Sequence, residues 1–110
     1  MARWRLTRIN NMLDVKKIQQ EILANKVAKG FNTTDVYLEL CHLHDELGEV
    51  FRAYRKKLPD LGEELADVAI YLLGLAELLK IDLEAEVLKK VAKNKAREVE
   101  MVNGVVVHKK

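Results

Sequence analysis

The sequence of 110 residues has few of the residues that cross-link or bend a small protein. It contains one cysteine, Cys41, together with one proline and five glycines. A single thiol cannot form a disulfide within the chain and cannot build a zinc site made of cysteines. So few turn-forming residues argue against a sandwich of short β-strands and against a disordered chain.

The sequence also lacks an excess of one charge and a long apolar run. Lys and Arg number 19 against 17 for Asp and Glu, a formal net charge of +2, so nothing in the charge favours nucleic acid or an anionic membrane as a partner. The longest stretch without a charged residue, Val68–Ala76, has nine residues. A membrane-spanning helix needs roughly 20. Because the arginines at positions 3, 5 and 8 precede no apolar run, we expect no secretory signal and a cytoplasmic protein.

Apolar residues at helical spacing predict four helices in a single domain over residues 1–110. The helices are expected at about 13–29, 35–57, 61–79 and 83–100, with an N-terminal arm at 1–13 and a C-terminal tail at 101–110. Asp35 and Asp82 are the expected N-caps, and Pro59 separates the second helix from the third. Asn103-Gly104 between valines predicts a turn, in a small hairpin or an ordered tail. Short connections make neighbouring helices antiparallel, so we expect an all-α, antiparallel four-helix bundle.

The third predicted helix is apolar on nearly every face between Leu65 and Leu79. A helix that is hydrophobic all round is normally buried on all sides. Three other helices of a short chain barely suffice to cover it. We therefore expect a homo-oligomer, either a dimer or a tetramer, in which the bundle is completed by other copies.

The second and third predicted helices each contain a pair of carboxylates. Glu46 and Glu49 are three residues apart, as are Glu64 and Asp67, so each pair lies on one helix face. Glu49 lies ten residues before Pro59 and Glu64 five residues after it, and antiparallel helices would let the two pairs face each other. Four converging carboxylates would suit Mg²⁺, with Mn²⁺ as a possible substitute. The alternative is that these are acidic pairs on solvated helix faces, with Glu64 stabilised by the dipole of its own helix.

The order of these residues resembles that of the MazG-like nucleoside triphosphate pyrophosphohydrolases. The family's Glu-Glu-x-x-Glu stretch reads here Asp45-Glu46-Leu47-Gly48-Glu49, and its Glu-x-x-Asp stretch follows after fourteen residues as Glu64-Leu65-Ala66-Asp67. The resemblance continues through residues 68–73 and covers about residues 14–104. Asp45 departs from the first glutamate of the family and is left out of the expected ligand set. A final segment of the family, Lys-x-x-Lys-Asn-x-x-Arg, corresponds to Lys90, Lys93, Asn94 and Arg97. The two lysines and Arg97 are expected on one helix face, with Asn94 beside them.

The resemblance implies a MazG-type helical fold and hydrolysis of a nucleoside triphosphate between its α and β phosphates. The products would be a nucleoside monophosphate and pyrophosphate. By this resemblance the metal ligands would be Glu46, Glu49, Glu64 and Asp67, and Glu46 or Glu49 would also be catalytic as the acceptor of the proton of water. The phosphates of the substrate would be bound by Lys90, Lys93, Asn94 and Arg97.

Two other functions remain open at this level. An enzyme similar to phosphoribosyl-ATP pyrophosphohydrolase would share the chemistry and differ in substrate. A non-catalytic helical module for oligomerisation or binding would leave the acidic pairs in solvent. The preferred base is also open, because Phe31 is equally suited to line a base pocket, as residues near the first helix do in similar proteins, or to lie in the core.

Overall fold

The structure is a computed structural model that describes residues 12–97 and 99–108 of the chain. Its elements follow the order α2 (Val15–Ala28), α3 (Val36–Arg55), α4 (Leu61–Leu78), α5 (Leu83–Ala96), β1 (Val99–Val102) and β2 (Val105–His108). The predicted all-α class is confirmed, with a small hairpin added at the C-terminal end. Most of the predicted N-terminal arm, residues 1–11, lies outside the described residues. No helix in the described part of the chain is long and apolar enough to cross a membrane.

Aspartates define the starts of three helices. The side chains of Asp14, Asp35 and Asp82 each accept a hydrogen bond from the backbone N–H three residues later. Each bond satisfies one of the N–H groups that the first turn of a helix leaves without a partner. The sequence analysis identified the second and third of these caps. It began the first helix too early, because Asp14 precedes Val15 as the cap.

The fourth helix is shorter than predicted, and its predicted end at residue 100 is wrong. α5 ends at Ala96, and the backbone of Arg97 is extended, with φ −71° and ψ 128°. Beyond it, β1 and β2 pair antiparallel around the Asn103-Gly104 turn. Both turn residues have positive φ, 52° and 77°, which a tight two-residue hairpin turn requires and which Asn and Gly adopt readily. The expected hairpin at the tail is therefore present.

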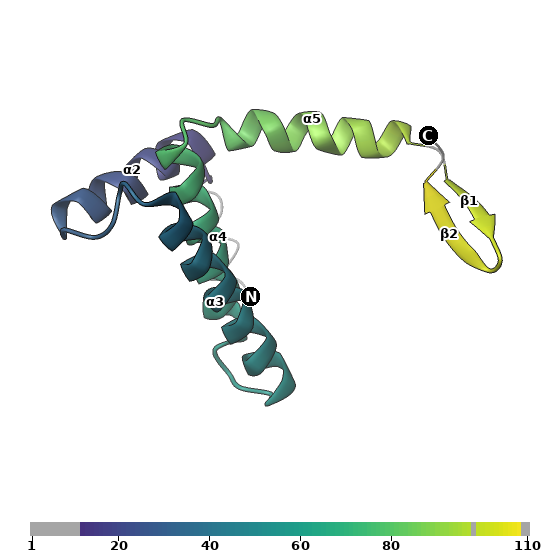
Figure 1. Cartoon of the computed structure of the whole chain (residues 1–110), viewed down its shortest axis with the longest axis horizontal. Helices are drawn as coiled ribbons and strands as arrows, with labels where there is room; N and C mark the ends of the chain where they lie inside the picture. Colours follow the sequence, from purple (N-terminus) through teal and green to yellow (C-terminus); the bar gives the residue numbers. More distant parts are fainter. Residues whose placement is uncertain (1–11, 98, 109–110) are drawn as a thin grey trace.

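α3 and α4 lie side by side as an antiparallel pair, joined by the turn that contains Pro59 (Figure 1). α2 packs against α4 at Gly74, where an added Cβ would lie 3.0 Å from Cγ2 of Ile22. Glycine therefore permits the close approach of these two helices. Gly48 of α3 has no atom of the described residues within 4 Å of an added Cβ, so no helix of the same copy approaches it closely.

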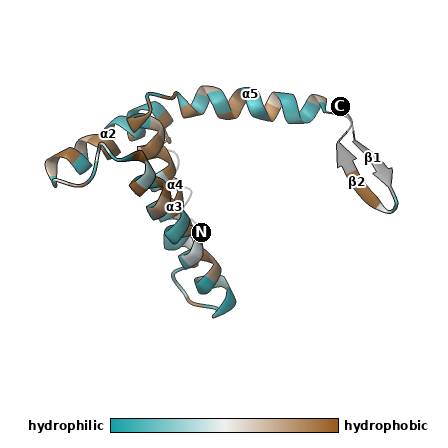
Figure 2. Cartoon of the chain, viewed as in Figure 1, coloured by the Kyte–Doolittle hydropathy of each residue, from teal (hydrophilic) through white to brown (hydrophobic). Residues whose placement is uncertain are grey.

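α5 extends away from the other three helices (Figure 1) and contains no buried residue. Its apolar side chains alternate with polar ones along its length (Figure 2), and Leu88 is 64% exposed. Among the described residues, the buried apolar side chains are those of Ala53, Leu75 and Ala76. Leu65 and Ile70 of α4 remain 53% and 46% exposed. One copy of the chain thus leaves apolar surface on α4 and α5 uncovered, more than scattered surface residues account for.

Gln19 connects α2 to the segment between α4 and α5. Its buried side-chain amide donates hydrogen bonds to Oε1 of Glu77, at 3.2 Å, and to the carbonyl of Ile81, at 3.0 Å. Its Oε1 accepts a bond from the backbone N–H of Leu83, at 3.2 Å. A single buried side chain therefore fixes the point from which α5 begins.

Candidate active site

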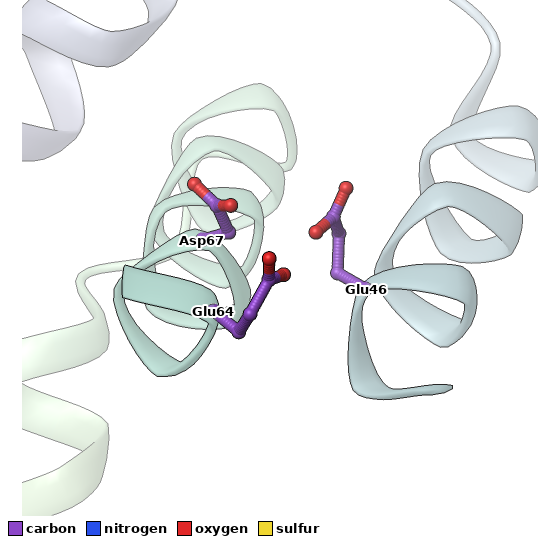
Figure 3. A group of neighbouring side chains, drawn as sticks. All are labelled: Glu46, Glu64 and Asp67. Carbon is purple, nitrogen blue, oxygen red and sulfur yellow. The ribbon is translucent and has the colours of Figure 1, made fainter. Parts of the chain in front are cut away.

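Three carboxylates meet between α3 and α4. Glu46 of α3 points toward Glu64 and Asp67 of α4 (Figure 3). One oxygen from each residue lies within 4.8 Å of the others, and all three residues are half-buried. The antiparallel pairing explains the meeting, because it brings one face of α3 against the face of α4 that Glu64 and Asp67 share at a spacing of three residues.

These three carboxylates have no counter-charge in the described part of the chain, where none of them makes a hydrogen bond or an ion pair. Partial removal from water raises the pKa of Glu64, and the negative charges of Asp60, Asp67, Glu49 and Glu46 raise it further. Asp60, at the start of α4, adds one buried oxygen that has no hydrogen-bond partner among the described residues. Negative charge is therefore concentrated here without compensation.

The donor atoms of this cluster fit a divalent cation. All are carboxylate oxygens, the ligands that Mg²⁺ and Mn²⁺ prefer. Two oxygens on opposite sides of a Mg²⁺ ion lie about 4.2 Å apart, twice the metal–oxygen distance. The separation of at most 4.8 Å between the oxygens of Glu46, Glu64 and Asp67 is close to this value. The sequence analysis named all three residues as ligands.

Glu49, the fourth predicted ligand, lies outside this cluster. Its carboxylate is paired with Arg52, whose Nη2 and Nε lie 3.2 Å and 3.3 Å from Oε2. Its charge nevertheless contributes to the raised pKa of Glu64, so it lies within electrostatic reach of the cluster. The role of Glu49 as a ligand stays a prediction.

The structure does not bring the predicted phosphate-binding residues to the acidic cluster of the same copy. Lys90, Lys93 and Asn94 are exposed on α5, which extends away from the α3–α4 pair (Figure 1). Arg97 follows α5 in extended conformation, and its backbone N–H donates to the carbonyl of Asn94. The prediction that Arg97 shares a helix face with the two lysines is therefore wrong, because the helix ends first.

A cavity of about 340 Å³ begins one helical turn from the acidic cluster. Tyr71 follows Asp67 by four residues, and His42 precedes Glu46 by four, so each shares the helix face of its cluster residue, and the antiparallel helices place both on the same side of the cluster. The rings of His42 and Tyr71 meet edge to face, with centroids 5.9 Å apart. The cavity is lined by Ile18, Glu21, Ile22, Asn25, Lys26, Phe31, Ile70 and Tyr71.

A second cavity, of about 280 Å³, shares Lys26, Phe31 and Tyr71 with the first. Glu39 is one of its lining residues and is 3% exposed. The carboxylate of Glu39 is paired with the ammonium of Lys26, and its Oε2 accepts a hydrogen bond from Nδ2 of Asn32 at 3.0 Å. Partial burial lowers the pKa of Lys26, whose Nζ also lies 5.6 Å from the centre of the Tyr71 ring.

Most of the residues around these cavities were not predicted from the sequence. Phe31 was one of two open alternatives, a pocket residue or a core residue, and it lines both cavities. Tyr71 had a usable signal, since a spacing of four residues places it on the helix face of Asp67. The pairing of Lys26 with Glu39 had none, because these residues belong to different helices whose relative placement depends on the intervening loop.

Both the sequence and the fold are similar to those of known proteins. Residues 37–102, more than half of the chain, match the model of the MazG nucleotide pyrophosphohydrolase domain. The fold is similar to a solved structure of the MazG-like pyrophosphohydrolase of cyanophage S-2L, with 28% sequence identity and a TM-score of 0.69. The similarity covers 89% of this chain and 99% of the phage protein, which is bound to dGDP and to three catalytic Mn²⁺ ions per active site. A search of curated protein sequences gives no match.

The matched segment contains Glu46, Glu64 and Asp67, and the solved structure shares the helical fold that brings them together. A divalent metal site agrees both with this cluster and with the metal content of the phage protein. The chain belongs to the MazG nucleotide pyrophosphohydrolase family and is a hydrolase that acts on phosphoanhydride bonds of nucleotides.

Proposed function

We propose that the protein cleaves nucleoside or deoxynucleoside triphosphates between the α and β phosphates and releases a monophosphate and pyrophosphate. The observation that carries this proposal is the cluster of Glu46, Glu64 and Asp67, three carboxylates within 4.8 Å and without a counter-charge in the described residues. A polyanionic substrate cannot approach such a cluster unless cations lie between them. The reaction is therefore expected to depend on divalent metal.

We propose Mg²⁺ as the metal, with Mn²⁺ able to replace it. Glu46, Glu64 and Asp67 would hold the metal through their carboxylate oxygens. When bound, divalent ions neutralise phosphate oxygens and lower the pKa of a coordinated water. The phage relative is bound to Mn²⁺ ions, which supports a divalent cation as the cofactor.

The reaction needs a proton acceptor in addition to the metal ligands. The oxygen of water forms a bond to one of the two phosphorus atoms joined by the α–β bridging oxygen, the bond from that phosphorus to the bridging oxygen breaks, and the monophosphate and pyrophosphate separate. Glu49 is the better of the two predicted acceptors, because it lies outside the three-carboxylate cluster and still acts electrostatically on Glu64. Arg52 fixes the Glu49 side chain by an ion pair at 3.2 Å. Glu46 is the second candidate.

We further propose that the protein is a homo-oligomer in which a second copy covers α4 and α5. The exposed apolar residues Leu65, Ile70 and Leu88 support it, because their burial between copies would be favourable. In such an assembly, Lys90, Lys93 and Arg97 would reach the acidic cluster of the second copy. This would place phosphate-binding cations beside the metal ligands, which one copy alone does not do.

Identification of the products tests the proposed reaction. Phosphorus NMR of a reaction with a deoxynucleoside triphosphate and Mg²⁺ should show a monophosphate and pyrophosphate in equal amounts. Glu46→Gln and Asp67→Asn should each lower the rate by about 100-fold or more, since even groups that only orient a metal ligand are worth about 10–100-fold. Glu84→Gln makes the same chemical change at an exposed position of α5 and should retain the wild-type rate. Release of orthophosphate, or full activity of both cluster variants, would contradict the proposal.

A further inference from the structure

The cavity of about 340 Å³ beside the acidic cluster contains two polar side chains whose hydrogen-bonding groups are free. Glu21 and Asn25 are four residues apart on α2, so they lie next to each other on the helix surface. Neither side chain makes a hydrogen bond or an ion pair within the described residues. Lys26, the nearby cation, is already paired with the buried Glu39. A carboxylate and an amide are therefore available to a ligand in this cavity.

The other walls of the cavity suit a flat ring. Phe31 and Tyr71 contribute aromatic side chains, and Ile18, Ile22 and Ile70 contribute aliphatic surface. The volume lies near the lower end of the range for small-molecule sites, about 300–1,000 Å³. Aromatic side chains stack on any nucleobase and do not distinguish one base from another. Discrimination between bases then depends on the polar side chains of the cavity, and among these Glu21 and Asn25 have no partner within the described residues.

The position of the cavity fits the base of a nucleotide, and this step rests on the proposed function. Tyr71 lies four residues beyond Asp67, a rise of about 6 Å along α4. His42 lies one turn before Glu46 on α3 and contacts the Tyr71 ring. A nucleotide whose α-phosphate lies at the acidic cluster would have its sugar beside His42 and Tyr71. Its base would then enter the cavity near Glu21.

We propose that Glu21 and Asn25 select guanine as the base of the substrate. An ionised carboxylate only accepts hydrogen bonds, and its two oxygens can accept two neighbouring donors. Guanine presents such a pair, the ring N1–H and the exocyclic N2–H, beside the acceptor O6. The two oxygens of Glu21 accept the pair, and the side-chain amide of Asn25 donates to O6.

Each of the other common bases would place an acceptor against the carboxylate of Glu21. Adenine has the lone pair of N1 next to its single amino group, and cytosine has the lone pair of N3 in the same relation. Thymine and uracil have one N–H between two carbonyl oxygens. A base that turns an acceptor toward Glu21 loses a hydrogen bond and is repelled by the carboxylate. Selection therefore comes from the unfavourable contacts of the other bases as well as from the hydrogen bonds to guanine.

Binding of nucleoside monophosphates tests this selection without any reaction. Calorimetric titration of the full-length protein with dGMP, dAMP, dCMP and dTMP, each with Mn²⁺ present, should show dGMP bound at least tenfold more tightly than the others. Glu21→Gln replaces one acceptor by a donor and should reduce the preference to about threefold or less. Because residue 21 is exposed, the variant should keep the melting temperature of the wild type. Glu84→Gln, an equivalent change on the exposed surface of α5, should keep the full preference for dGMP.

The outcomes separate base selection from the proposed reaction. Equal binding of the four monophosphates, failure of all four to bind, or an unchanged preference in Glu21→Gln would overturn the selection of guanine. A preference for dGMP that Glu21→Gln abolishes, in a protein that releases no pyrophosphate, would support the base site and contradict the reaction. Pyrophosphate release at equal rates from all triphosphates would support the reaction and contradict guanine selection.

Discussion

Glu46 and Asp67 lie 21 residues apart in the sequence, yet their carboxylates face each other across α3 and α4 (Figure 3), within 4.8 Å. The turn at Pro59 reverses the chain between them and makes the two helices antiparallel. Two ionised carboxylates at this separation repel each other and have lost part of their hydration. The fold therefore holds these carboxylates together against their repulsion, and a bound cation would offset that repulsion.

The first prediction is that divalent metal stabilises the folded protein. A ligand that binds only the folded state at 100 times its dissociation constant adds about 2.7 kcal/mol to the free energy of unfolding. For a protein of this size, such a gain corresponds to a rise in melting temperature of about 10 °C. Thermal melts with and without Mn²⁺ should show it, and Glu46→Gln and Asp67→Asn should reduce it. An unchanged melting temperature in the wild type at millimolar Mn²⁺ would contradict the prediction.

The second prediction concerns pH. The pKa of Glu64 is raised above 4.5, so folding favours its protonated form. The stability that this residue contributes is fully present below the pKa of the unfolded chain and is lost as pH rises through the higher pKa of the folded protein. Without metal, the wild type should therefore lose stability relative to Glu64→Gln over this pH interval. Urea unfolding of both proteins from pH 4 to pH 8 measures the difference, and parallel curves would contradict it.

Metal affinity should change with pH in the opposite direction. A carboxylate must lose its proton to bind a cation, so Mn²⁺ affinity should fall as pH drops through the raised pKa of Glu64. Calorimetric titrations of the wild type over the same pH range measure this loss. A constant affinity would show that Glu64 is not a ligand.

The third prediction concerns Gln19. Gln19→Leu would leave the carbonyl of Ile81 and the N–H of Leu83 without their partners. An unsatisfied group costs about 1–3 kcal/mol when fully buried, and these two groups are only partly buried, so the free energy of unfolding should fall by about 1–3 kcal/mol in total. Gln20→Leu makes the same change at the next, exposed position of α2 and should cost less than about 0.5 kcal/mol. Urea unfolding at one fixed protein concentration compares the two, and equal losses would contradict the role of Gln19.

The fourth prediction concerns assembly. Leu88 is 64% exposed in one copy, so Leu88→Glu should leave a lone copy unaffected and place an unpaired charge in an interface between copies. Sedimentation velocity at micromolar concentration should show a dimer or larger species for the wild type and a smaller species for the variant. Lys16→Glu introduces the same residue at an exposed position of α2, outside the proposed interface, and should preserve the assembly. A monomeric wild type would contradict the proposed oligomer.

The acidic cluster could be predicted because its geometry depends on local rules. A spacing of three residues fixes Glu64 and Asp67 on one face of α4, and the Pro59 turn fixes the direction of α3 relative to α4. The short connection between α3 and α4 also fixes how far the two helices are shifted along each other. This alignment brings Glu46 opposite Glu64 and Asp67. Glu49 shares its helix with Glu46, but Arg52, three residues later, forms an ion pair with the Glu49 carboxylate. The spacing of the acidic residues alone does not indicate this ion pair.

The parts that could not be predicted depend on contacts between distant segments. Residues 97–100 continue a helical composition, yet Val99 pairs with His108 and the chain becomes a strand. The buried pair of Lys26 and Glu39 joins two helices across the loop that contains Asn32, and no spacing in the sequence indicates it. The direction of α5 is likewise set by nonlocal contacts, through Gln19. The sequence pattern therefore indicates the basic residues of α5 but does not indicate that α5 extends away from the acidic cluster.

Anomalous X-ray diffraction from crystals grown with Mn²⁺ tests the metal site most directly. The expected result is a strong anomalous peak between Glu46, Glu64 and Asp67, within about 2.0–2.6 Å of their carboxylate oxygens. The peak should be weakened or lost in crystals of Asp67→Asn. Manganese bound elsewhere on the protein, with these three carboxylates left in contact only with water, would contradict the assignment.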